Sequence, residues 1–369
     1  MEFIISRTDL LKNLQAVKNV IQSKNTNPVL DNFLFDFEPG KLHVYGSDSE
    51  STLQATIPLE VHEAGKFLIP ADKLLNTLKN LPEQPLTFHI ENNTVHITAE
   101  NGKYTLPYEN GEHFPLPPEL QDPFVREMNA SPLAEAIDKT IFATSNDEMR
   151  PALTGVLFHF KPDALNLVAT DAHKLVKYSL LDYASEEPLE YILPKKPLQI
   201  LKNLLAGQEF SVDASFTDRL AQFAFDNMVL TTVLINAKFP EYDKVIPLDN
   251  PNKLIVNREQ FLNALRRTSI YASQTTYLVK LVFKGSQLQI LARNEDMNSE
   301  AVENLTVNYE GEDMTIGFNA KSLMEMISHA DSEELEITMS TPTRAVLFHP
   351  LDGMAENEEI LMLLMPIAY

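Results

Sequence analysis

The sequence predicts an α+β fold made of three tandem domains, and three observations support this prediction. Short strand-like runs of apolar residues recur along all 369 residues, and each group of strands is interrupted by one short amphipathic helix. A strand–helix–strand pattern appears three times, beginning near Phe67, Tyr191 and Thr315. The stretches between these patterns also resemble one another. Antiparallel strands with one helix per group place the helices on one face of the sheets.

Three landmarks repeat with one period, which is the signature of an internal repeat. One strand-to-helix junction recurs at spacings of 124 and 125, at Pro70, Pro194 and Asn319. A strand ending in a small polar corner recurs at spacings of 123 and 123, at Asp48, Asp171 and Asn294. A second junction recurs at spacings of 123 and 128, at Leu10, Leu133 and Phe261. One third of the chain is 123 residues, so we predict three copies.

Each copy divides further into two similar units. In the first third, residues 3–5 form a predicted strand and residues 8–22 a predicted helix with Thr8 as its N-cap, because apolar residues recur there at helical spacing. The strands FLFDF, KLHVYG and STLQATIPL follow, joined by turns such as Pro39-Gly40. Then come the strand KFLIP, a helix over 72–80, and the strands LTFHI, TVHIT and KYTLP. A βαβββ unit therefore occurs twice per third and six times in the chain.

Proline- and acid-rich segments at 113–123 and 244–253 separate the thirds. We therefore predict domains over residues 1–122, 123–249 and 250–369.

Composition excludes several classes of function. The chain has no cysteine, so it has no disulfide, no thiolate metal site and no cysteine nucleophile. We find no phosphate-binding loop, no nucleophile elbow and no HExxH motif. The sequence predicts no metal, no cofactor and no enzymatic activity. The first residues do not resemble a signal peptide and no apolar run is long enough to span a bilayer, so we expect a cytoplasmic protein.

The net charge of −22 opposes binding to nucleic acid, but the charges are sorted along the chain. The six predicted helical stretches hold 13 basic and 5 acidic residues, and the remainder holds 17 basic and 47 acidic residues. A basic helix layer on an acidic body is typical of a protein that meets a polyanion on one side only. Lysine is also a good helix former, which is the alternative explanation.

Over its full length the sequence resembles the β subunit of bacterial DNA polymerase III, the sliding-clamp family. The resemblance rests on six motifs in order: FLIPADKLL, RPALTGVLF (150–158), VATDAHKLV (168–176), KFPEYDKVIP (238–247), TIGFNAKSL (315–323) and LMPIAY (364–369).

This resemblance implies a processivity factor without catalytic activity. Two three-domain chains would pair head to tail as a homodimeric ring around double-stranded DNA, with helices lining the hole and sheets outside. The implied partners are DNA of any sequence, the polymerase III α subunit, the clamp loader and other proteins with a Gln-Leu-x-Leu-Phe-like motif. The implied location is the cytoplasm, in association with the nucleoid.

The resemblance also assigns site residues. The peptide-binding groove between the second and third domains would comprise Leu153, Thr170, Ala172, His173, Leu175, Pro240, Val245, Val346, Leu363, Met365, Pro366 and Ile367. The DNA-facing residues would be Lys12, Lys24, Lys73, Lys196, Lys202, Lys244 and Arg267. The dimer interface would join Tyr104 of one chain to Ile270 and Tyr271 of the other. Departures from the family pattern at Ala172, Ala345 and Ala368 would change the polar contacts of the groove.

Two other hypotheses belong to different classes. The first is an acidic scaffold that binds only proteins. The second is a hydrolase that uses Asp171 and His173, for which no nearby nucleophile is evident.

Overall fold

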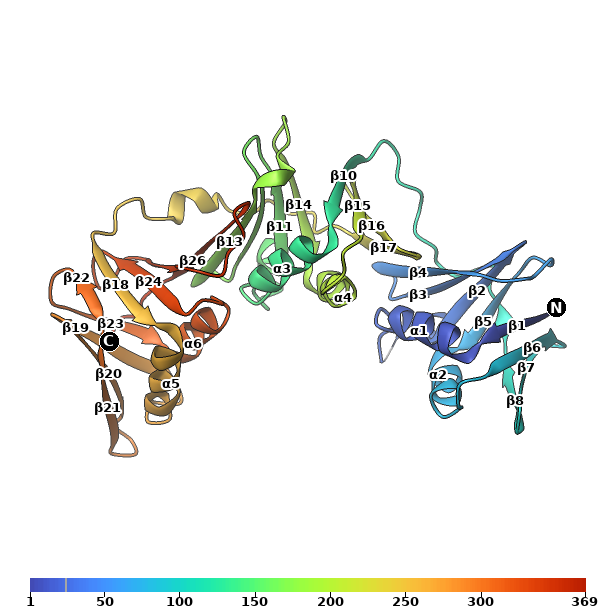
Figure 1. Ribbon diagram of the computed structural model, residues 1–369, viewed down its shortest axis with the longest axis horizontal. Coiled ribbons are helices and arrows are strands. Elements are labelled where there is room, and N and C mark those ends of the chain that lie inside the picture. The colour runs from blue at the N-terminus through green and yellow to red at the C-terminus, as the bar shows by residue number, and fades with distance from the viewer. Residues whose placement is uncertain (24) are drawn as a thin grey trace. The chain divides into compact units, whose positions relative to one another are not determined.

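The structure, a computed structural model, describes residues 1–23 and 25–369 and divides into two compact units (Figure 1). One unit comprises Met1–Ala134 and Lys196–Leu234, and the other comprises Glu135–Lys195 and Ile235–Tyr369. The middle third of the chain is therefore shared between the two units. Within the described residues, no helix has the length and apolarity required to cross a membrane.

The first unit contains a nine-stranded and a four-stranded antiparallel sheet. The strand orders are β10-β15-β16-β17-β4-β3-β2-β5-β9 and β1-β6-β7-β8. The strands are β1 (Glu2–Ser6), β2 (Asn32–Glu38), β3 (Lys41–Ser47), β4 (Ser51–Pro58), β5 (Gly65–Pro70), β6 (Pro85–Glu91), β7 (Thr94–Ala99), β8 (Gly102–Pro107), β9 (Glu109–Asn110), β10 (Phe124–Asn129), β15 (Ser211–Phe216), β16 (Leu220–Phe225) and β17 (Met228–Val233).

The second unit repeats this arrangement with orders β14-β11-β12-β13-β26-β25-β24-β18-β22 and β21-β20-β19-β23. Its strands are β11 (Gly155–Phe160), β12 (Leu165–Thr170), β13 (Lys174–Leu180), β14 (Leu189–Pro194), β18 (Asn252–Asn257), β19 (Leu278–Lys284), β20 (Gln287–Asn294), β21 (Ser299–Thr306), β22 (Asn308–Glu310), β23 (Met314–Asn319), β24 (Glu334–Met339), β25 (Val346–Pro350) and β26 (Glu358–Leu364).

Six α-helices accompany the sheets in the described residues. They are α1 (Arg7–Lys18), α2 (Ala71–Lys79), α3 (Ala130–Ile141), α4 (Lys195–Leu205), α5 (Arg258–Ser269) and α6 (Ala320–Ser328). Short 3₁₀ turns occupy Pro28–Asp31, Pro151–Leu153, Leu181–Tyr183 and Tyr242–Val245. The helices α1 and α2 lie side by side in the first unit, as do α5 and α6 in the second (Figure 1). The residues that the structure describes thus form six βαβββ units, and the predicted α+β fold is confirmed.

The first helix differs from its prediction at both ends. Its N-cap is Ser6, whose Oγ accepts a hydrogen bond from the backbone N–H of Asp9 at 3.4 Å, so the prediction of Thr8 was wrong. The helix ends at Lys18 rather than near residue 22. Val20 and Ile21 are still buried beyond the helix, which explains why the apolar pattern extended further than the helix itself.

The predicted polar corners confirm the repeat at the level of single hydrogen bonds. Asp48 Oδ1 accepts from the backbone N–H groups of Glu50 and Ser51, at 3.1 and 2.7 Å. One period later, Asp171 Oδ1 accepts from those of His173 and Lys174, at 2.9 and 2.8 Å. Carboxylates of this kind satisfy backbone donors in tight turns, which explains why an acidic residue recurs at this corner.

Strand pairing explains why the compact units differ from the thirds of the chain. In the first unit β4 pairs with β17, and in the second β13 pairs with β26, so each large sheet joins strands from successive thirds. The predicted boundaries at 122 and 249 therefore stay a prediction.

Candidate functional site

A cavity of about 350 Å³ opens in the second unit beside the pairing of β13 with β26. Its lining comprises Leu153, Thr170, Ala172, His173, Lys174, Leu175, Pro240, Glu241, Tyr242, Val245, Leu363 and Met365. The lining is mostly apolar and includes a few polar side chains such as Thr170 and His173. A cavity of this size and character is typical of a binding pocket for a small apolar group.

The register of the strands creates the apolar floor of this pocket. Leu175 of β13 lies directly opposite Leu363 of β26, and Leu363 lies opposite Leu347 of β25. Because side chains alternate between faces along a strand, these three share one face. They belong to a buried cluster that also includes Phe239 and Tyr242 from the segment covering this face.

The structure brings together nine of the twelve residues assigned to the groove by resemblance. The other three, Val346, Pro366 and Ile367, do not line the cavity. Val346 is buried and pairs with Leu364, so it occupies the face of the sheet opposite to Leu347. Pro366 and Ile367 follow Met365 out of the cavity.

Sequence reasoning did not identify Lys174, Glu241 and Tyr242 as lining residues. All three lie in the motifs at 168–176 and 238–247 that supplied identified residues, so the signal was present in the same motifs. Burial raises the pKa of the Tyr242 hydroxyl, which therefore stays protonated and lies 3.0 Å from Nδ1 of His159. This hydrogen bond fixes the Tyr242 ring in the wall of the pocket.

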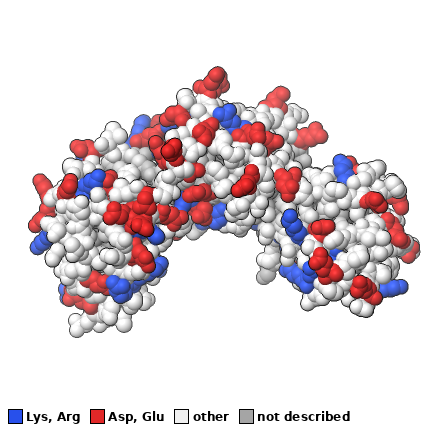
Figure 2. All heavy atoms as spheres, viewed as in Figure 1, with Lys and Arg blue, Asp and Glu red and all other residues white. Residues whose placement is uncertain are grey.

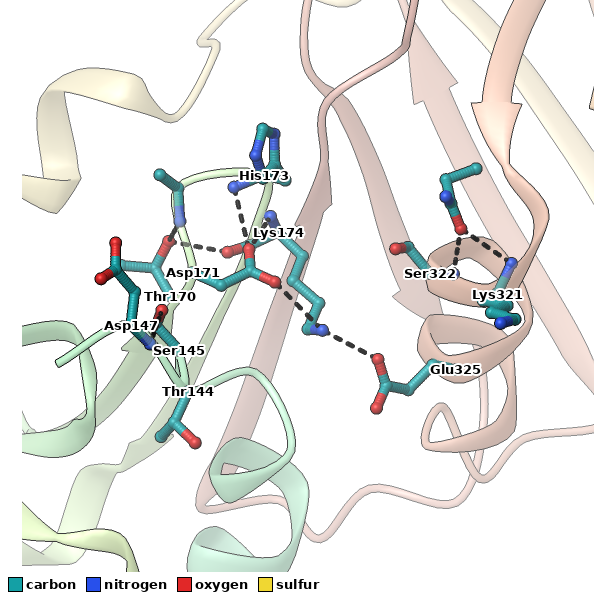
Figure 3. Close-up of polar contacts among 12 residues, drawn as sticks. Thr144, Ser145, Asp147, Thr170, Asp171, His173, Lys174, Lys321, Ser322 and Glu325 are labelled. Carbon is teal, nitrogen blue, oxygen red and sulfur yellow. Dashed lines mark hydrogen bonds and ion pairs between the residues drawn. The ribbon is translucent and has the colours of Figure 1, made fainter. Parts of the chain in front are cut away.

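Lys174 connects the corner beside the pocket to helix α6 (Figure 3). Its Nζ lies 2.8 Å from Oε2 of Glu325 and 3.2 Å from Oδ2 of Asp171. Burial disfavours the charge of Lys174, but the two carboxylates outweigh this effect and raise the pKa of the ammonium above its ordinary value. Lys174 therefore stays charged and holds the corner against α6.

The same geometry argues against the hydrolase hypothesis. The carboxylate of Asp171 is bound to two backbone N–H groups and to Lys174, and none of these contacts involves the imidazole of His173. In Figure 3 the ring of His173 points away from the carboxylate. Asp171 thus has a structural role in the corner.

The six helices keep an excess of basic residues when their observed bounds are used. They hold 13 basic and 6 acidic residues, the additional acid being Asp9 in the first turn of α1. On the face seen in Figure 2, acidic side chains are spread over the surface and basic ones are fewer. The separation of charge by secondary structure therefore persists.

The residues assigned to DNA contact differ in their exposure and in the hydrogen bonds and ion pairs that they already form. Lys12 and Lys73 are exposed, whereas Lys202 is half-buried on α4. Nζ of Lys196 donates to the carbonyl of Val20 at 2.8 Å and pairs with Asp48. Arg267 forms a two-pronged ion pair with Glu303, and Lys244 pairs with Glu241. Lys24 lies outside the described residues.

The residues assigned to the dimer interface are exposed apolar side chains. Ile270 is 78% exposed, Tyr271 44% and Tyr104 38%. Tyr104 belongs to β8, an edge strand of the four-stranded sheet of its unit. Ile270 and Tyr271 follow α5. This helix contacts β21, an edge strand of the four-stranded sheet in the second unit.

Comparison with known proteins finds the family that the sequence motifs resemble, and the matches extend along nearly the whole chain. Models of the DNA polymerase III beta subunit match its N-terminal domain at residues 1–118, its central domain at 127–241 and its C-terminal domain at 243–368. The beta sliding clamp of Pseudomonas aeruginosa is 30% identical over 370 residues, which cover all of both chains. The beta sliding clamp of Haemophilus influenzae is 29% identical over 342 residues, 92% of this chain and 93% of that one.

The chain belongs to the DNA polymerase III β subunit family. It is therefore a sliding clamp, a non-catalytic component of DNA replication. A crystal structure of the DNA polymerase III subunit beta of Pseudomonas aeruginosa superposes with a TM-score of 0.95 at 28% identity over all of both chains. A sliding clamp of Bartonella birtlesii bound to griselimycin superposes with a TM-score of 0.91, also at 28% identity over all of both chains.

The departure from the family pattern at Ala172 has a direct structural cost. Ala172 has φ +77°, a left-handed conformation that glycine adopts without penalty and alanine does not. Ser49 occupies the same position of the first repeat with φ +79°. The turn therefore demands this conformation in both copies.

We expect Ala172→Gly to stabilise the protein by about 0.5–1 kcal/mol, because the relief of backbone strain exceeds the added flexibility of the unfolded chain. Urea unfolding would measure the shift of the midpoint. Ala206→Gly, at a position without positive φ, is the matched control and should be destabilising. A loss of stability in Ala172→Gly would contradict the inference that the backbone at Ala172 is strained.

Proposed function

We propose that the chain forms a homodimeric ring around duplex DNA and tethers replication proteins through the pocket beside β13 and β26. It acts in the cytoplasm, at the nucleoid. The observation that supports the tethering role is the cavity itself, because nine residues assigned to the family groove line it.

The sorting of charge supports the DNA part of the proposal. An excess of basic residues on the helices, in a chain with net charge −22, suits a surface that meets phosphates weakly. A ring holds DNA by enclosing it, so strong phosphate contacts are unnecessary and would slow sliding. Lys12 and Lys73, which are exposed, are the best placed of the assigned residues. Lys196 and Arg267 would first have to give up their acidic partners.

The free sheet edges support the dimer. Within the described residues, β8 and β21 end the two four-stranded sheets and carry no further strand. Unpaired edges of this kind invite pairing with another chain. Pairing β8 of one chain with β21 of a second, twice around a two-fold axis, would give both strands a partner and close the assembly.

The chemistry of the pocket suits a short peptide with leucine and phenylalanine side chains. The apolar floor formed by Leu175 and Leu363 would receive those side chains. The hydroxyl of Thr170 is already bonded to Lys174 O and Ala172 N–H, so His173 is the freer polar group at the rim. Partners with a Gln-Leu-x-Leu-Phe-like motif, such as the polymerase III α subunit and the clamp loader, fit this pattern.

Binding of a labelled Gln-Leu-Ser-Leu-Phe peptide tests this proposal. We expect micromolar binding to the intact chain and loss of binding to a chain truncated after Leu364, because truncation removes Met365 from the wall. Fluorescence anisotropy would measure both. The control is a peptide in which alanine replaces both leucines and the phenylalanine. If the truncated chain bound the peptide with equal affinity, the peptide would not bind in this pocket. If the intact chain did not bind it, the proposed preference for a Gln-Leu-x-Leu-Phe-like motif would be contradicted.

A further inference from the structure

Residues 365–369 run from the pocket to a different sheet of the second unit. The first anchor is at the pocket, where the backbone N–H of Met365 donates to the carbonyl of His173 at 2.8 Å. The second anchor is at β23, where the N–H of Ile367 donates to the carbonyl of Gly317 at 2.9 Å. Met365, which lines the pocket, is therefore held from both sides.

The contact with β23 uses the free edge of a sheet. In the order β21-β20-β19-β23, β23 is the last strand. The carbonyl of Gly317 accepts from Ile367, and the carbonyl of Thr315, two residues earlier, accepts from the Tyr369 hydroxyl at 3.2 Å. Carbonyls two residues apart point to the same edge of a strand. The segment thus lies along the edge of the sheet, joined to β23 by one backbone hydrogen bond and one from the Tyr369 hydroxyl.

The ring of Tyr369 fits a site built by two residues of that sheet. Nζ of Lys280 lies 3.9 Å from the ring centroid, in the geometry of a cation–π contact. A side-chain carbon at Gly317 would lie 2.6 Å from Cδ1 of Tyr369 and 2.8 Å from the carbonyl oxygen of Ile367. Only glycine at 317 leaves room for the segment in this position.

We propose that Tyr369, seated on Gly317 and Lys280, is a positioning residue that sets the place of Met365 in the wall of the pocket. The inference rests on the proposed function of the pocket as a peptide site. Tyr369 acts without touching the peptide. Its contacts fix one end of a five-residue segment whose other end is fixed at His173.

Peptide affinity of point variants tests this role. Tyr369→Ala should raise the Kd of the Gln-Leu-Ser-Leu-Phe peptide roughly three- to tenfold, and Lys280→Gln should act in the same direction. Tyr369→Phe keeps the ring and should cost less. Lys284→Gln removes a lysine from the same strand, away from Tyr369, and should bind like the unaltered chain. Unchanged affinity in both Tyr369→Ala and Lys280→Gln would overturn the proposal.

The methyl resonance of Met365 gives a readout that does not depend on the peptide. In protein labelled at methionine methyl groups, with Met365 assigned through Met365→Leu, the resonance should shift and sharpen in Tyr369→Ala. An unmoved resonance would overturn the anchor even if the peptide failed to bind. Failure of the unaltered chain to bind, with a shifted resonance, would instead contradict only the proposed peptide function.

Gly317→Ala separates an effect on the segment from an effect on β23. The variant should lower stability in the full chain but much less in a chain truncated after Leu364, because truncation removes Tyr369 and Ile367. Urea unfolding of the four proteins measures this difference. An equal loss in both backgrounds would show that β23 itself requires glycine, which would count against the anchor.

Discussion

Protein loaded by a clamp loader and ATP onto a nicked circular plasmid should stay bound through gel filtration, and should dissociate when the plasmid is cut once. A closed ring leaves circular DNA only by opening, whereas it slides off a free end. Without enclosure, the weak basic helices would give only non-specific binding, with a Kd on the order of 10⁻⁴–10⁻⁶ M at physiological salt. We therefore expect retention to fall by orders of magnitude on cutting.

Two variants sharpen this experiment. Lys12→Glu combined with Lys73→Glu reverses two exposed helix charges and should weaken loading and polymerase processivity. Lys41→Glu, on a strand, is the matched control and should leave both unchanged. Equal retention on linear and circular DNA would contradict enclosure. Full processivity in the double variant would favour the scaffold hypothesis, in which the basic helices serve only packing.

If the proposed dimer forms through these residues, Ile270→Glu should convert it to monomers, with the Kd of dimerisation rising about 100-fold or more. Ile270 is 78% exposed in the single chain and adjoins Tyr271, which is 44% exposed, so together they form an exposed apolar pair after α5, the helix that contacts the edge strand β21. A glutamate at the centre of an apolar contact would bury a charge without a partner. Sedimentation velocity over a dilution series measures the change.

Leu248→Glu is the matched control for this prediction. Leu248 is 99% exposed, but it lies in the segment between the 3₁₀ turn Tyr242–Val245 and β18, which contains none of the residues assigned to the interface. It should leave the dimer intact. Tyr104→Ala should weaken the dimer as Ile270→Glu does, because the interface is assigned to both residues. An unchanged dimer in Ile270→Glu would contradict this assignment.

The sequence by itself determined the repeat, the α+β class and the family. Local patterns carry these features: the strand and helix periods depend on neighbouring residues, and the polar corners at Asp48 and Asp171 depend on hydrogen bonds within four residues. Nine lining residues of the pocket were also assigned by the resemblance, and eight of them lie in the motifs that carry it, the ninth being Leu363 directly before LMPIAY. The basic character of the helices followed from counting charges alone.

Only the tertiary structure decided which residues share a face and which charges are already paired. The pairing of β25 with β26 placed Leu347 on the pocket side and Val346 on the other, a choice that one residue of register would reverse. Contacts between distant segments tied Lys196 to Asp48 and Arg267 to Glu303. The seat of Tyr369 on Gly317 and Lys280 likewise joins residues far apart in the chain. Sequence patterns describe neighbours along the chain, whereas these contacts depend on how the strands pair.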